Sequence, residues 1–137
     1  MKVRSGFPIA ALLAAAFCSG CDVLDSKQFV LPNASATDRL TIKRAIKSTA
    51  IGAGLSDRTQ TSITPDTIAY YTDPNNQFRV SLGARMVKTS AVIDLSCFHP
   101  GPGTSPLFKK VDLSLTDTLT HEFGARLTIP DRHHMVP

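Results

Sequence analysis

The residues best suited to catalysis are few and widely spaced in this sequence. Cys97 and His99 lie two positions apart, and in an extended strand such residues point the same way at roughly 6.6 Å, beyond hydrogen-bonding reach. The spacing therefore does not predict a thiol nucleophile activated by a neighbouring imidazole. The alternation of Cys97 with Ile93 and Leu95 instead predicts a buried, small apolar side chain.

The other histidines do not form a recognisable metal or catalytic motif. His121 and Glu122 stand near the end of a predicted helix, where a cation complements the helix dipole. His133 and His134 follow Asp131 in a polar tail, without a thiol nearby in the sequence. The motifs typical of serine hydrolases, phosphate-binding loops and zinc proteases do not occur. We therefore assign no catalytic, cofactor-binding or metal-binding residue, although an enzyme that gathers acids and bases from distant positions stays open.

The composition is that of one globular domain, with 42% hydrophobic and 19% charged residues in 137. The formal charge of +4 includes Lys2 and Arg4, and it falls to +2 if the first 20 residues are removed. DNA-binding and RNA-binding proteins concentrate many more basic residues on one face. We therefore expect no nucleic-acid partner.

The first 20 residues have the order of a secretory signal peptide. Residues 1–6 carry Lys2 and Arg4 without an acid, residues 7–17 are uncharged and rich in Ala and Leu, and small residues follow. The apolar run is about eleven residues long, whereas a membrane-spanning helix needs roughly 20. The pattern predicts that residues 1–20 are removed.

The next residues carry a resemblance to a known class of protein. Cys18-Ser19-Gly20-Cys21 resembles the lipobox of bacterial lipoproteins, in which Ser or Ala and then Gly or Ala precede the modified cysteine. Ser19, Gly20 and Cys21 match this pattern, and Cys18 departs from it because leucine is usual there. Two alternatives stay open, an ordinary secreted protein cut near residue 16 or 20 and a redox pair of Cys18 with Cys21.

The resemblance implies an address in the cell envelope. Cys21 would carry diacylglycerol and an N-acyl chain such as palmitate, which together suffice for stable anchoring. The domain would then face the periplasm. Asp22 is similar to the signal that retains lipoproteins in the inner membrane, and we expect that membrane.

Behind the signal peptide we expect a tether at residues 21–36, one domain at 37–130 and a flexible tail at 131–137. The tether is polar except for Phe29-Val30-Leu31, which has a second interpretation as a short edge strand or a docking segment. The tail is polar and terminal, as flexible segments usually are.

The fold class expected for residues 37–130 is α+β. A first helix capped by Thr37 or Asp38 ends near Gly54, and a second begins at Ser105 and ends at Gly124. Between them, residues 66–72, 77–86 and 91–98 alternate or are rich in β-branched and aromatic residues, which predicts antiparallel strands. Residues 127–129 could add a fourth. The expected architecture is a two-layer sandwich, a three- to four-stranded sheet with two helices on one face.

Two surfaces are candidates for interaction. One is a Pro-Gly connector between the last long strand and the second helix, because loops on rigid scaffolds often carry function; it comprises His99, Pro100, Gly101, Pro102 and Gly103. The other is the basic face of the first helix, which either is simply solvated or contacts anionic lipid headgroups; it comprises Lys43, Arg44 and Lys47.

The function expected from these features is that of a membrane-anchored envelope lipoprotein with a non-catalytic domain that binds another envelope protein. An alternative is a domain that binds lipid or a small ligand, in a pocket between helices and sheet or on the basic helix. A further alternative is an envelope enzyme without a recognisable motif. No cofactor is expected.

Overall fold

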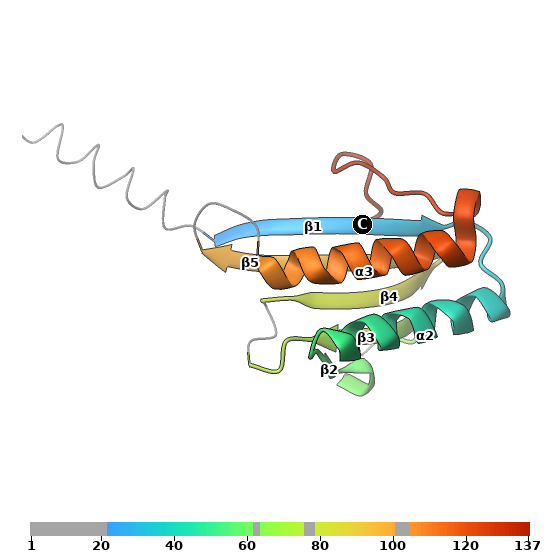
Figure 1. Ribbon diagram of the computed structural model, residues 1–137. Helices are drawn as coiled ribbons and strands as arrows, with labels where there is room; N and C mark the ends of the chain where they lie inside the picture. The colour runs from blue at the N-terminus through green and yellow to red at the C-terminus, as the bar shows by residue number, and fades with distance from the viewer. Residues whose placement is uncertain (1–21, 62–63, 76–78, 101–104) are drawn as a thin grey trace, which may run out of the picture.

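The computed structural model describes residues 22–61, 64–75, 79–100 and 105–137, without the side-chain surroundings of residues 22, 23, 99 and 100. Five strands form one antiparallel sheet in the order β1-β5-β4-β3-β2 (Figure 1). In chain order, the elements are β1 (Asp22–Leu31), α2 (Ala36–Gly52), β2 (Ser56–Asp57), η1 (Thr59–Thr61), β3 (Thr67–Thr72), β4 (Ser81–Val87), β5 (Ser90–Pro100), α3 (Pro106–Phe123) and η2 (Gly124–Arg126).

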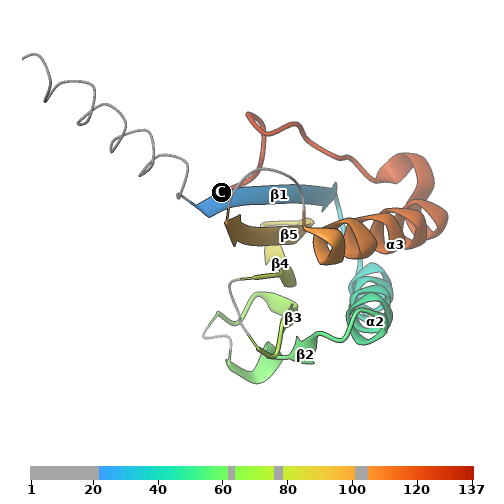
Figure 2. The same cartoon turned by 60° about the vertical axis from the view of Figure 1, so that its left-hand side comes forward.

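Both long helices cover the same face of the sheet, as the two views of the molecule show (Figures 1 and 2). The buried apolar side chains of α2, α3 and the sheet form one core cluster between them. The α+β prediction, with an antiparallel sheet and two helices, is confirmed. The prediction of three or four strands is wrong, because the sheet has five.

The largest correction concerns residues 22–31, which we expected to belong to a tether and which form β1 instead. This strand pairs with β5 along its whole length, from Asp22 opposite Pro100 to Leu31 opposite Ala91. Phe29 and Leu31 are fully buried beneath the helices. The alternative interpretation of residues 29–31 as an edge strand is thus confirmed, and the strand is longer than expected. Its pairing satisfies a row of backbone amides and carbonyls of β5 that would otherwise lack partners.

The first helix begins slightly earlier than expected, with Ser35 as its cap. The Asp38 backbone N–H donates to the Ser35 hydroxyl at 3.0 Å, and the Ser35 N–H donates to the Asp38 carboxylate at 2.9 Å. This reciprocal arrangement is a capping box, which satisfies two backbone donors at once. Leu40, although apolar, is 55% exposed because it lies outside the helix face that meets the sheet.

The strands between the helices form the predicted meander. β4 begins at Ser81 rather than at residue 77, and residues 76–78 lie outside the described part of the chain. The β4–β5 hairpin closes on the pair Val87 and Ser90. Alternate side chains of β4 and β5 point into the core as expected and are nearly or fully buried: Leu82, Ala84, Ala91, Ile93, Leu95 and Cys97.

The second helix follows its sequence signals closely. Ser105 caps it, Pro106 stands in its first turn, and Gly124 ends it with a positive φ of 53°. The predicted apolar stripe is buried at Phe108, Val111, Leu115, Leu119 and Phe123. The short final strand is reduced to a single bridge, between Thr128 and Val30.

Candidate functional site: the open face of the sheet

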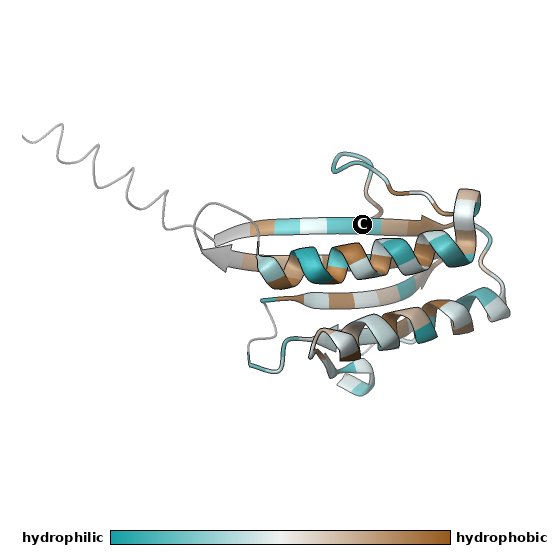
Figure 3. Cartoon of the chain, in the orientation of Figure 1, coloured by the Kyte–Doolittle hydropathy of each residue, from teal (hydrophilic) through white to brown (hydrophobic). Residues whose placement is uncertain are grey.

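The sheet face away from the helices is polar and partly hollowed, and we call it the open face. Because side chains alternate along a strand, the partners of the core-facing residues point to this side. They include Gln28 on β1, Asp94 and Ser96 on β5, and Arg85 on β4. The hydropathy colouring shows hydrophilic residues in the middle of β1, ahead of its apolar end (Figure 3).

Gln28 is almost completely buried on this face, with 2% of its surface exposed. Its Oε1 accepts the backbone N–H of Val136 at 2.7 Å, and its Nε2 donates to the Val136 carbonyl at 3.0 Å. The same Nε2 lies 2.8 Å from Oδ1 of Asp94. The Gln28 amide therefore pairs with a main-chain amide unit in the way that a neighbouring backbone would.

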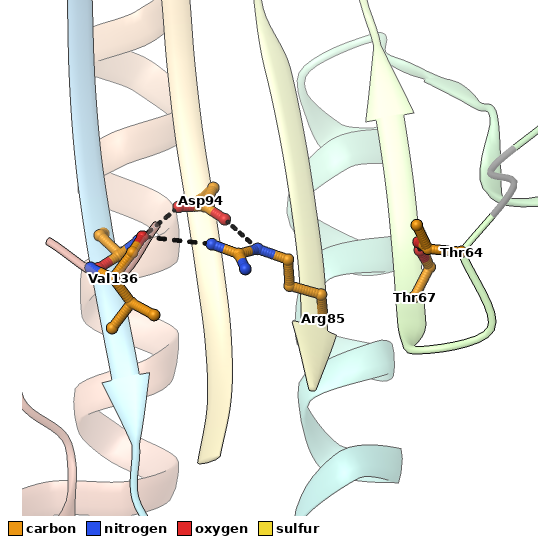
Figure 4. Close-up of polar contacts among 6 residues, drawn as sticks. Thr64, Thr67, Arg85, Asp94 and Val136 are labelled. Atoms are coloured by element: carbon orange, nitrogen blue, oxygen red, sulfur yellow. Dashed lines mark hydrogen bonds and ion pairs between the residues drawn. The ribbon is translucent and has the colours of Figure 1, made fainter. Parts of the chain in front are cut away.

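An ion pair adjoins this contact and reaches the next strand. Arg85 Nε donates to Oδ2 of Asp94 at 3.2 Å, and its Nη2 donates to the Val136 carbonyl at 3.3 Å (Figure 4). The side chains of Arg85 and Asp94 are 33% and 44% exposed, so solvent screens their attraction. The pair thus serves to orient donors and acceptors more than to stabilise the fold.

The C-terminal residues lie against the open face and the outer edge of β1. Thr128 and Val30 exchange backbone hydrogen bonds of 2.8 and 2.9 Å, and Arg132 donates to the Leu24 carbonyl at 2.7 Å. Val92 points to the open face and yet is fully buried. These contacts tie residues 128–136, which include most of the expected flexible tail, to β1 and the sheet.

Beside the tail, the open face contains a hollow of about 350 Å³. Gly83 contributes no side chain to the hollow, and an added Cβ there would stand 3.2 Å from Cδ2 of Tyr70. The hydroxyls of Ser81 and Ser96 share a hydrogen bond of 2.7 Å across β4 and β5. The lining residues are Thr61, Thr67, Ala69, Tyr70, Ser81, Gly83, Ala84, Arg85, Asp94 and Ser96.

This lining is suited to binding polar groups. It offers several hydroxyls, one aromatic ring and one ion pair, and it contains neither histidine nor cysteine. The Asp94 carboxylate already accepts from Gln28 and Arg85, so its oxygens are committed to holding the face together. The arrangement can receive hydrogen-bonding groups along the sheet.

The candidate chemical residues of the sequence lie elsewhere. Cys97 is fully buried on the helix side, and burial raises the pKa of its thiol, as expected for a core residue. His134 Nδ1 lies 2.5 Å from the Asp131 carboxylate on the surface. Within the described ranges, no group of three or more His, Cys, Asp or Glu side chains is placed to hold a metal ion.

The candidate interaction residues are not part of the hollow. Lys43, Arg44 and Lys47 are exposed on α2, which covers the opposite face of the sheet. His99 and Pro100 are the last residues of β5, and Gly101, Pro102, Gly103 and Cys21 lie outside the described residues.

Sequence reasoning missed Gln28, Arg85 and Asp94 as a group. Arg85 and Asp94 were assigned to the polar side of their strands, but only the register shows that they lie near each other. Gln28 was assigned to the tether. A signal for it existed in the alternation of the apolar residues Phe29 and Leu31, both buried, with Gln28, which is the pattern of a strand with one buried face.

No helix in the described residues is long and apolar enough to cross a membrane. Comparison of the chain with protein-family models, with curated proteins and with solved structures found no match. The interpretation of the open face therefore depends on its geometry.

Proposed function

We propose that this chain is a lipid-anchored protein of the bacterial cell envelope whose non-catalytic domain binds an extended segment of another protein on the open face. The signal-like residues 1–20 and the lipobox resemblance ending at Cys21 support the anchor. Asp22 favours the inner membrane, with the domain facing the periplasm. The open face supports peptide binding.

The observation that carries the binding proposal is the contact between Gln28 and Val136. A buried side-chain amide that accepts a backbone N–H and donates to the carbonyl of the same residue recognises main chain, regardless of side chain. Arg85 adds a second donor to the same carbonyl. The tail supplies one residue, Val136, to this contact. An extended segment of a partner would use the same donors and acceptors, and the hollow next to them leaves room for its side chains.

Binding of the tail from solution tests whether the face recognises peptides. In a chain that ends at Pro130, we expect a synthetic heptapeptide of residues 131–137 to bind saturably, measured by calorimetry or fluorescence anisotropy. Gln28→Ala should weaken this binding about tenfold or more, because two hydrogen bonds and their buried partners are affected.

Gln60→Ala, on the exposed surface of η1, is the matched control and should leave the affinity unchanged. Circular dichroism should show that the shortened chain keeps its secondary structure. Equal affinities for Gln28→Ala and Gln60→Ala, or no saturable binding to the folded shortened chain, would argue against a peptide-binding face.

The anchor is tested separately by intact mass. Protein purified from native membranes should begin at Cys21 and carry the added mass of acyl groups, and a Cys21→Ser variant should lack that mass. An unmodified chain that begins elsewhere would refute the anchor, while leaving the peptide-binding face to its own test.

The hollow favours a second candidate function, the binding of a small polar ligand. Its volume lies at the lower end of the range for ligand pockets, roughly 300 to 1,000 Å³. Gly83→Val would put methyl groups beside the Tyr70 ring, in the hollow. If a small molecule is released when the native protein is denatured, mass spectrometry should find it with the wild type and not with folded Gly83→Val.

A further inference from the structure

The start of the sheet leaves no room for a flexible spacer behind the proposed anchor. β1 begins at Asp22, the residue that directly follows Cys21. Leu24 is three residues beyond Cys21, about 10 Å along a strand at roughly 3.3 Å per residue. Interfacial segments insert to a depth of roughly 5 to 10 Å, so a side chain this close to the lipidated residue is within reach of the interfacial region. A lipid on Cys21 would therefore hold this end of the sheet at the membrane surface.

The same end carries exposed apolar side chains. Leu24 on β1 and Phe98 on β5 are paired directly across the two strands, and they are 39% and 42% exposed. Both point to the open face. The next pair on that face, Ser26 with Ser96, is polar. The surface is thus apolar next to the anchor and becomes polar with distance from it.

Positive charge is found at the same end of the molecule, on the helix side of the sheet. In Figure 1, α3 begins at the end of the sheet where β1 begins and β5 ends. Lys109 and Lys110 are exposed near the start of α3. The two lysines lie on the helix side of the sheet, whereas Leu24 and Phe98 point to the open face. Exposed cations at the same end of the molecule as exposed apolar side chains match the interfacial region of a bilayer that contains anionic lipids.

We infer that Leu24 and Phe98 enter the interfacial region of the membrane and fix the orientation of the domain on its lipid anchor. This inference depends on the proposed lipidation of Cys21. The end of the sheet where β1 begins and β5 ends would then lie at the bilayer, and the β4–β5 turn would face away from it. The open face and its hollow would be turned sideways, accessible to a partner in the periplasm.

The chain contains no tryptophan, so a single introduced tryptophan can report on the surroundings of this surface. We would purify Phe98→Trp in its lipidated form and reconstitute it into vesicles of phosphatidylcholine and phosphatidylglycerol, with or without brominated acyl chains. We expect a blue-shifted emission that the brominated lipid quenches at least about twofold, because bromine quenches only on contact within the bilayer.

Ile129→Trp is the matched control. Ile129 is also exposed, at 47%, and it adjoins Thr128, which pairs with Val30 near the far end of β1. Val30 lies six positions beyond Leu24 along the strand, or about 20 Å. The emission of Ile129→Trp should therefore be equal in brominated and ordinary vesicles.

Intact mass of each preparation separates the two proposals. An acylated Phe98→Trp protein that is not quenched would overturn this inference and leave the anchor in place. A blue-shifted emission without quenching would show that protein covers the surface, and it would also overturn the inference. A mass without acyl groups would overturn both, and equal quenching of the two variants would show insertion without the orientation inferred here.

Discussion

Cys97 illustrates how burial determines the chemistry of a residue. Its side chain is fully enclosed on the helix side of β5, and loss of solvation raises the pKa of the thiol. The thiolate is the nucleophilic form of cysteine, so a raised pKa lowers reactivity at neutral pH. Ile93 and Leu95, its neighbours in the alternation, are equally buried. The residue acts as part of the core.

We expect a thiol reagent to label Cys97 at least about a hundredfold more slowly in the folded protein than in denaturant, because labelling requires opening of the core. A Cys21→Ser chain without residues 1–20 has Cys97 as its one thiol, which makes the measurement specific. Rapid labelling of the folded chain would contradict the buried position.

Lys27 connects β1 to α3 on the core side. Its Nζ donates to the Asp112 carboxylate at 2.7 Å and to the Thr116 hydroxyl at 3.1 Å. We expect Lys27→Ala to lower the free energy of unfolding by about 1 to 2 kcal/mol, since the pair is half-buried and the Asp112 carboxylate loses its counter-ion, keeping only the Thr116 hydroxyl as a donor. Urea denaturation measures the change. Lys47→Ala, on the exposed face of α2, should change it by less than about 0.5 kcal/mol, and equal losses would refute a specific role for Lys27.

At the scale of elements, the start of α2 is joined to η2, the short helix that follows α3. Arg126 Nη2 lies 2.6 Å from Oδ2 of Asp38, the residue that also completes the capping box. The Arg126 hydrogen bond, helped by the Ser35 backbone N–H, holds the pKa of Asp38 well below its ordinary value of 3.8. A carboxylate with a lowered pKa stabilises the folded state above its unfolded pKa, and this stabilisation declines as the pH falls further.

We expect Asp38→Asn to reduce the free energy of unfolding at pH 7, measured by urea denaturation. The difference from the wild type should be constant above about pH 5 and should shrink as the pH is lowered from about 4 to 2, because Asp38 itself becomes neutral there. Asp117→Asn, on the exposed surface of α3, should change the value at pH 7 by less than about 0.5 kcal/mol. A difference that stays constant down to pH 2 would contradict the role of the Asp38 charge.

At the scale of the whole molecule, the C-terminal residues protect the outer edge of β1. An edge strand with free backbone groups is a template for pairing with another chain. The bridge between Thr128 and Val30 and the Arg132 contact with the Leu24 carbonyl occupy this edge. The tail therefore covers part of the β1 edge as well as part of the open face.

We expect a chain that ends at Arg126 to form dimers through β1 at micromolar concentration, measured by sedimentation velocity. A chain that ends at Pro130 keeps Thr128 and should remain mostly monomeric. Both comparisons use the form without residues 1–20 and with Cys21→Ser, so that lipid does not drive association. Monomers in both cases would show that the edge is protected in another way.

Part of the fold could be predicted because local signals were strong. The ends of α3 were marked by Ser105, Pro106 and Gly124 as expected, and the alternation in β4 and β5 identified which side chains are buried. β1 was missed because its core-facing residues include Lys27, whose charge is balanced by Asp112 from a distant helix. The open-face site was missed for the same reason, since Gln28, Asp94 and Val136 meet only through long-range pairing.

The sequence by itself determined the α+β class, the ends of α3, the buried face of the meander and the basis for the proposed envelope address, because caps, period-two alternation and signal-like segments are local properties. The tertiary structure alone decided the two further strands β1 and β2, the register and the path of the tail. These depend on which edge of β5 needs a partner and which distant polar groups satisfy one another. The proposed peptide-binding face arises from that second kind of information, because hydrogen-bond partners far apart in the chain are matched only when the sheet is assembled.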